Sequence, residues 1–296
     1  MKTNAKIDWR RVAVNDLDLS RWKAAVVGGT AGIGRAIGLS LASRGAKVTV
    51  VGRTFRDEGV ANLTFRKADL SLMREAARIG KELPAEQLDL VVFTTGIMPA
   101  PQREESAEGI EREVAVSYLS RLVILRELAP RLGSDRPAER ARMKPRVFVM
   151  GMPGTNQVGS ADDLNAERSY APMRVHTNTV AGNEMLVIDG AARYPHATLF
   201  GLSPGLVRTE IRDSYFGKGS LKSKIVEGLI GLFTPAPDQY AERIVPLLVS
   251  PDLEGHSGAM FDRKGRSVAP TARLVDPSYR TQFLAASQAL VARAQL

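Results

Sequence analysis

The chain has 296 residues, which is long enough for two average domains, but no linker or composition shift divides it, so we expect one domain over residues 1–296. Hydrophobic residues make up 44% and charged residues 25%, as in ordinary globular proteins, and this excludes disordered, collagen-like and coiled-coil classes. The sequence contains no cysteine, which excludes disulfides, thiolate zinc sites and a cysteine nucleophile.

The net charge of +9 calls for a test of nucleic-acid binding. Basic residues are concentrated in residues 131–146, where only Asp135 and Glu139 oppose them: Arg131, Arg136, Arg140, Arg142, Lys144 and Arg146. This segment contains glycine and proline and no aromatic residue, which favours a solvated insertion over a nucleic-acid surface. We therefore expect no nucleic-acid partner.

No apolar run reaches the ~18 residues that a membrane-spanning helix needs. The first residues, MKTNAKIDWRR, lack the apolar centre of a signal peptide. These two features predict a cytoplasmic protein without a membrane partner.

Short β-branched runs alternate along the chain with longer helical patterns. The runs that predict strands cover residues 24–29, 47–52, 88–96, 146–151 and 197–205. Residues 32–45 and 108–129 carry apolar side chains at steps of three and four, as helices that face a core do. This alternation predicts an α/β fold, a single Rossmann-type, doubly wound parallel sheet with helices on both faces. In such a sheet, ligands bind beyond the carboxyl ends of the strands.

A glycine-rich turn, GGTAGIG, follows the first expected strand and opens the first expected helix. Glycines allow a tight turn and let backbone N–H groups approach a pyrophosphate at the start of a helix. The context predicts dinucleotide binding by Gly28, Thr30, Gly32, Ile33 and Gly34. A plain tight turn is the alternative.

The second expected strand ends in Gly52-Arg53-Thr54. NAD-binding sheets place an acidic residue here, roughly 20 residues past the glycines, to hold the ribose hydroxyls. A guanidinium instead binds a 2′-phosphate, which a carboxylate would repel. We expect Arg53 and Thr54, assisted by Arg56, to select NADP(H); a solvated arginine at the strand end is the alternative.

These motifs resemble those of the short-chain dehydrogenase/reductase family, whose TGxxxGxG signature is matched here with Val27 in place of Thr. Asp69-Leu70 stands where the family's third strand ends in an acid that contacts adenine. Residues 94–97, TTGI, stand where the family has Asn-Asn-Ala-Gly-Ile. The resemblance implies cofactor contacts at Asp69, Leu70, Thr95 and Gly96.

The resemblance continues to residues 203–209, SPGLVRT, which match the family's PGxxxT segment after the sixth strand. The cofactor residues that it implies there are Pro204, Gly205, Val207 and Thr209. It covers residues 21–262 and implies about seven strands, a substrate lid over 206–237, and a C-terminal tail or helix over 263–296. The lid sequence mixes cations with aromatic residues, which suits a partly apolar substrate.

The family's proton relay of Asn, Ser, Tyr and Lys is altered here. Alignment places Ser117, Gly151, His176 and Val180 at these positions. His176 then takes the place of the tyrosine, and an imidazole can donate or accept a proton near neutral pH. We expect His176 and Ser117 to be catalytic.

Tyr170 is an alternative proton donor, because Arg174 follows it at the family's Tyr-x-x-x-Lys spacing. Pro172 lies between them, close to where the helix is expected to begin. No pair of histidines has the spacing of metal ligands, so no metal site is expected.

The resemblance implies an atypical NADP(H)-dependent oxidoreductase that transfers hydride to or from a small, partly apolar carbonyl, imine or activated alkene. Two alternatives stay open: a non-redox enzyme such as an isomerase, cyclase or dehydratase, and a catalytically silent NADP-binding protein. The helices around Ser117 and Val187 resemble those through which the family forms dimers and tetramers, which implies a homodimer or homotetramer.

Overall fold

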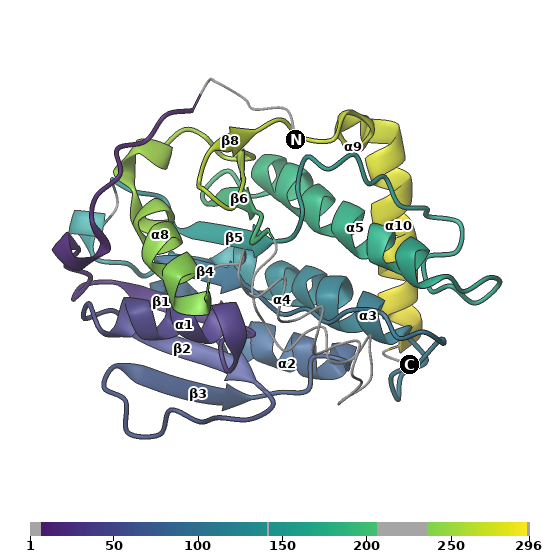
Figure 1. The fold of residues 1–296 in the computed structure, drawn as a ribbon, viewed down its shortest axis with the longest axis horizontal. Helices are drawn as coiled ribbons and strands as arrows, with labels where there is room; N and C mark the ends of the chain where they lie inside the picture. Colours follow the sequence, from purple (N-terminus) through teal and green to yellow (C-terminus); the bar gives the residue numbers. More distant parts are fainter. Residues whose placement is uncertain (1–6, 141, 206–235, 295–296) are drawn as a thin grey trace.

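The computed structural model describes residues 7–140, 142–205 and 236–294 (Figure 1). The segment expected to form the lid therefore lies outside the described residues from 206 to 235. Val207 and Thr209, two of the expected cofactor residues, lie there as well.

The described part of the chain forms one eight-stranded sheet with the order β3-β2-β1-β4-β5-β6-β7-β8. The strands are β1 (Lys23–Val27), β2 (Lys47–Gly52), β3 (Leu63–Lys67), β4 (Leu90–Phe93), β5 (Arg146–Met150), β6 (Thr198–Leu202), β7 (Met260–Phe261) and β8 (Ser267–Val268). Neighbouring strands are parallel as far as β7, and β8 pairs antiparallel with β7. The doubly wound α/β fold predicted from the sequence is confirmed.

The eighth strand is a departure from the seven that the resemblance implied. β8 is only two residues long and returns along β7 through a tight turn. Asp262 holds this turn, since its carboxylate accepts hydrogen bonds from the N–H groups of Lys264 and Arg266. A strand this short leaves no periodic signal in the sequence.

Helices cover both faces of the sheet and create two separate cores (Figure 1). The longer helices are α1 (Gly32–Ala42), α2 (Met73–Glu82), α4 (Ser120–Leu128), α5 (Pro172–Arg193), α8 (Pro237–Val249) and α10 (Pro277–Ala294). α1 and α8 pack together on one face, while α2, α4 and α5 lie on the other. Because both faces are covered, β4 and β5 are buried along their whole length, which explains their unbroken apolar sequences.

Shorter helical segments complete the described part of the chain. Two are α-helical, α3 (Arg112–Val114) and α9 (Ala272–Val275). The 3-10 turns cover Val14–Asp16, Ala85–Gln87, Ala129–Arg131, Ala138–Arg140 and Pro251–Leu253. Between α3 and α4 the backbone widens into a π-helical turn at Ala115–Leu119. Such turns are often found at functional sites, and this one contains Ser117.

The basic segment 131–146 does not form the solvated insertion that its composition predicted. Arg136 and Arg140 both pair with the buried carboxylate of Asp89, at 3.5 Å and 3.1 Å. Arg146 is fully buried and donates to Glu254 at 2.9 Å. Asp89 and Glu254 are distant from the segment in sequence, so its composition could not reveal that the cations are held against the protein.

The C-terminal residues form helix α10, which packs against α5 (Figure 1). Phe283 and Leu290 of α10 are buried, and Ser287 shares a hydrogen bond of 2.8 Å with the hydroxyl group of Tyr118, at the start of the α4 region. α10 therefore occupies part of the surface around Ser117 and Val187 that the sequence assigned to subunit contacts.

None of the described helices is long and apolar enough to cross a membrane.

Candidate active site

A cavity of about 1090 Å³ lies at the carboxyl ends of the parallel strands. It brings together most of the cofactor residues expected from the sequence: Gly28, Thr30, Gly32, Ile33, Gly34, Arg53, Asp69, Leu70, Thr95, Gly96, Pro204 and Gly205. Among the predicted catalytic residues, Ser117 and His176 also line it, whereas Tyr170 does not. Thr54 lies next to Arg53 but outside the lining.

The glycine turn packs so closely against the loop after β4 that side chains are excluded. Gly28 has a positive φ of 91°, and a Cβ atom placed on it would lie 2.5 Å from the backbone nitrogen of Thr95. A Cβ on Gly34 would collide with the Thr94 hydroxyl group. The predicted pattern of glycines thus has a steric cause in this fold.

Helix α1 directs its first turn at the same cavity. Its N-cap residue, Ala31, supplies no side-chain hydrogen bond, so no side chain caps the first N–H groups of the helix. Gly32, Ile33 and Gly34 line the cavity at this point. Uncapped N–H groups together with the positive end of the helix dipole favour a phosphate, so this turn fits the pyrophosphate of a dinucleotide.

Two arginines line the cavity beyond β2. Arg53 and Arg56 are exposed, and neither forms an ion pair with another residue of the described ranges. Asp57, the nearest acidic residue in the sequence, is buried and accepts hydrogen bonds of 3.0 and 2.9 Å from Nε of Arg35. Because its carboxylate is already paired, the cavity keeps a positive edge at the end of β2.

Asp69 follows β3 and lines the cavity near Arg53. Its carboxylate accepts hydrogen bonds from the backbone N–H and the hydroxyl group of Ser71, at 3.0 and 2.8 Å. Burial acts to raise the pKa of Asp69, but the Ser71 hydrogen bonds and the nearby Arg53 and Arg112 leave it below the ordinary value. Asp69 is therefore an ionised acceptor at neutral pH.

Ser117 occupies the π-helical turn and connects it to the loop after β4. Its hydroxyl oxygen accepts a hydrogen bond of 3.0 Å from the Ile97 N–H, and the hydroxyl group donates to the Ile97 carbonyl at 3.3 Å. Gly151, which replaces the family's serine, brings no side chain to the cavity wall. Both relay positions thus shape the wall of the cavity.

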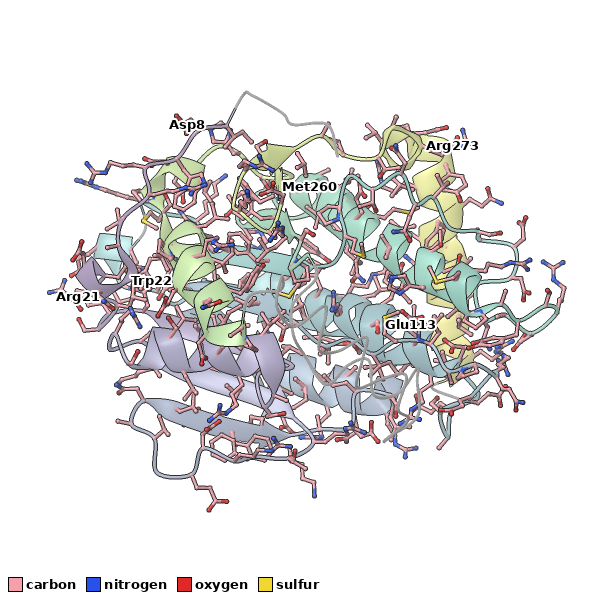
Figure 2. The ribbon with its side chains drawn as sticks, in the orientation of Figure 1. Asp8, Arg21, Trp22, Glu113, Met260 and Arg273 are labelled. Carbon is pink, nitrogen blue, oxygen red and sulfur yellow. The ribbon has the colours of Figure 1, made fainter. Side chains whose placement is uncertain are left out.

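His176 is held by a buried carboxylate that the sequence analysis missed. Its Nδ1 lies 2.7 Å from Oε1 of Glu113, on α3, where α3 packs against α5 (Figure 2 labels Glu113). Thr179 donates to the same oxygen at 3.2 Å, and Oε2 has no partner among the described residues. Glu113 is 1% exposed, and burial raises its pKa despite the contacts with His176 and Thr179.

Glu113 left one signal in the sequence. In the predicted helix 108–129 it stands at helical spacing from Ile110 and Ser117, on the stripe that faces the protein interior. A carboxylate on such a stripe requires a partner, but its partner lies 63 residues further along the chain. Only the packing of α3 against α5 identifies it as His176.

The start of α5 differs from the expectation. The helix begins at Pro172, so His176 lies in its second turn and not at its first residue. Pro172 at the first helical position is well tolerated because that residue needs no N–H donor. The boundary error arose because proline was treated as an interruption of this helix.

Tyr170 lies just before α5 and faces away from the cavity lining. Its hydroxyl group donates to the Ala100 carbonyl oxygen at 2.5 Å. Burial, together with the acidic side chains around it, raises the pKa of Tyr170 to about 12. A strongly bonded phenol with a raised pKa, outside the lining, is a poor proton donor for a ligand in this cavity.

Arg121 is a second buried group that the sequence analysis missed. It lies one helical turn after Ser117, lines the cavity floor and is 3% exposed. Its guanidinium donates to the carbonyl oxygens of Thr95 and Met150 and, at 2.9 Å, to the Asn183 amide oxygen. It therefore joins the ends of β4 and β5 to α5 beneath the cavity.

Within the described ranges, no cluster of three His, Asp or Glu side chains could hold a metal ion.

Comparison with known proteins agrees with this geometry. The family described as short chain dehydrogenase matches residues 23–139. An uncharacterized oxidoreductase of Saccharomyces cerevisiae is 44% identical, over 99% of this chain and 95% of that protein. The polyprenol dehydrogenase of Mus musculus is 28% identical over 79% of this chain and 73% of its own length.

Solved structures show the same fold. The aldohexose dehydrogenase of Thermoplasma acidophilum superposes with a TM-score of 0.62 at 16% identity, covering 83% of this chain and 93% of that one. The 44% identical relative spans nearly the whole chain, and the family match includes the glycine turn and the loop after β4. The chain therefore belongs to the short-chain dehydrogenase/reductase family of oxidoreductases, whose fold implies a nicotinamide cofactor.

Proposed function

We propose that the protein is an NADP(H)-dependent reductase in which His176 exchanges the proton with a small, partly apolar carbonyl, imine or activated-alkene substrate. One observation carries the proposal. A single cavity has free arginines beyond β2 and the His176–Glu113 pair beyond β4 and β5. Because β1 and β4 separate these strands in the sheet, the two groups lie at opposite ends of the cavity.

The residues of the cavity suit an NADP dinucleotide. The glycine turn and the uncapped start of α1 fit its pyrophosphate. The Arg53 and Arg56 guanidinium groups match a 2′-phosphate, and Asp69 is placed to accept from the adenine amine. When bound, the cofactor supplies or accepts the hydride.

The chain's own contribution to the chemistry is proton transfer. The Glu113 carboxylate bonds to Nδ1 of His176 and leaves Nε2 as the nitrogen that exchanges a proton. When hydride adds to a carbonyl carbon, the oxygen gains negative charge, and the His176 imidazolium can give it the proton that completes the alcohol. A proton from solvent then restores the imidazolium. Glu113 stabilises that cation and orients the ring.

The proposed class of substrate follows from the rest of the lining. Apolar side chains surround the His176 end of the cavity: Met98, Val116, Met150, Met152 and Val180. Methionine adapts to irregular apolar shapes, and a mostly apolar wall with a few polar groups is typical of small-molecule sites. This environment favours a substrate with an apolar body and one reactive polar group.

The test begins with titration of the purified protein with NADPH and NADH, followed by nicotinamide fluorescence. A panel of carbonyl, imine and activated-alkene compounds is then examined for both cofactor absorbance and product. Selective NADPH binding with substrate-dependent oxidation supports the proposal. Conversion of substrate with unchanged cofactor would identify a non-redox enzyme, and binding without any conversion would identify a silent NADP-binding protein.

The homodimer or homotetramer predicted from the sequence is not part of this proposal, because α10 occupies part of the expected interface. The small-molecule substrate is retained. The cytoplasmic location stays a prediction.

A further inference from the structure

Arg121 is a buried cation without a counter-charge. Each of its three hydrogen-bond acceptors is neutral: two backbone carbonyl groups and the Asn183 amide. Its Nε has no partner, and no carboxylate of the described residues lies within ion-pair distance. The other deeply buried arginines differ, since Arg136 is paired with Asp89 and Arg146 with Glu254.

Such an arrangement is costly for the protein. Taking a guanidinium out of water costs several kcal/mol unless an opposite charge is near, although carbonyl dipoles directed at it recover part of that cost. Burial accordingly lowers the pKa of Arg121 to about 9, which still leaves it mostly cationic at neutral pH. The floor of the cavity thus carries a positive charge in a medium of low dielectric, where its field is weakly screened.

The charge lies at the reacting end of the proposed site. Arg121 joins Thr95, after β4, to Met150, the last residue of β5. These strands lie across the sheet from Arg53, which follows β2. A dinucleotide that places its 2′-phosphate at Arg53 therefore directs its nicotinamide towards the half of the cavity that Arg121 underlies.

Val180 sharpens the importance of this position. It lines the same half of the cavity and stands where the family's relay has a lysine, so α5 brings no ammonium group there. Arg121 enters instead from α4, on the other side of the cavity floor, and its guanidinium reaches Asn183, three residues beyond Val180.

Resting on the proposed function, we propose that Arg121 makes the site bind NADPH more tightly than NADP⁺. The oxidised nicotinamide ring carries a positive charge that the reduced ring lacks. A fixed guanidinium beneath the ring opposes the oxidised form and leaves the neutral reduced form nearly unaffected. The consequence is a reductase that takes up the reduced cofactor and releases the oxidised one.

The measurement is the ratio of the dissociation constants for NADP⁺ and NADPH, obtained by calorimetry at one pH and one salt concentration. A ratio within one variant cancels any loss of folded protein, because partial unfolding weakens both ligands equally. Arg121→Gln removes the charge and keeps a donor, whereas Arg121→Lys keeps the charge. Arg146→Gln is the matched control, a buried arginine at the opposite end of β5.

We expect Arg121→Gln to lower the ratio about tenfold, and Arg121→Lys to keep it within about threefold of the unaltered protein. Arg146→Gln should leave the ratio unchanged. Asn183→Asp provides an independent variant if Arg121→Gln fails to fold. It puts a carboxylate 2.9 Å from the guanidinium and should lower the ratio without removing Arg121.

Two results would overturn the inference. An unchanged ratio in Arg121→Gln or Asn183→Asp would show that the charge does not act on the cofactor. An equal fall in Arg121→Lys and Arg121→Gln would assign Arg121 to hydrogen bonding only. Failure of the proposed function looks different, because the unaltered protein would then bind neither nucleotide.

Discussion

Nδ1 of His176 lies 2.7 Å from Oε1 of Glu113, and this contact joins α5 to α3 at the wall of the cavity. Glu113 is almost completely buried, and its second carboxylate oxygen has no partner in the described ranges. A carboxylate in this setting makes a neighbouring imidazole easier to protonate and fixes which of its nitrogens exchanges the proton.

The pair predicts a graded loss of activity. His176→Phe should lower kcat about 10³-fold because the proton partner is lost, and Glu113→Gln about 10- to 100-fold because the ring loses its orienting charge. KM should change little in Glu113→Gln. Steady-state kinetics at saturating NADPH measure both effects, and Tyr170→Phe is the control, since this hydroxyl group is bonded to Ala100 outside the lining. Loss of activity in Tyr170→Phe with activity kept in His176→Phe would reverse the assignment.

Cofactor choice can be tested at Arg53. Arg53→Glu replaces a guanidinium that suits a 2′-phosphate with a carboxylate that repels it, so NADPH should bind about 100-fold more weakly. NADH, which has no such phosphate, should bind within about threefold of its original affinity. Arg142→Glu makes the same charge change at an exposed residue outside the cavity and should affect neither nucleotide. Equal weakening of NADPH and NADH by Arg53→Glu would remove the 2′-phosphate assignment.

Glu111 makes stability depend on pH. Burial, with a contribution from Glu113, raises its pKa to about 7 from an ordinary value of 4.5, although the Val114 N–H opposes the shift. The folded state therefore holds this proton more tightly than the unfolded state does. Its stabilising effect is complete below about pH 4.5 and is lost as the pH rises through about 7.

Glu111→Gln keeps the cap on α3 but cannot ionise. At pH 8 the variant should have a free energy of unfolding about 1–3 kcal/mol above that of the unaltered protein, and this gain should shrink towards pH 5. Urea unfolding at both pH values measures it. Glu58→Gln, at an exposed position, should show no such trend. A gain that is the same at both pH values would contradict the shifted pKa of Glu111.

Helix α10 predicts the state of assembly. Because Phe283 and Leu290 pack inward and Ser287 is bonded to Tyr118, the surface beside α5 is occupied within one chain. We expect a monomer of 32.1 kDa by light scattering after size exclusion. A mass twice as large would show that another surface of the chain pairs, or that α10 is displaced.

Local sequence was sufficient for the fold and for the cofactor half of the cavity. Strands, helices and the glycine turn leave periodic or steric patterns over a few neighbouring residues, which is why Gly28, Gly34 and Arg53 were identified correctly as cavity residues. The approximate position of His176 also followed from spacing, since α5 is one regular helix.

Only the tertiary structure decided which charges are paired and where each is buried. Glu113 meets His176, and Arg121 meets Thr95 and Asn183, through contacts between elements that are far apart in sequence. The sequence by itself determined the scaffold because secondary structure and close backbone approach are local properties. The electrostatics of the site depends on distance and burial, and these exist only once the helices are packed on the sheet.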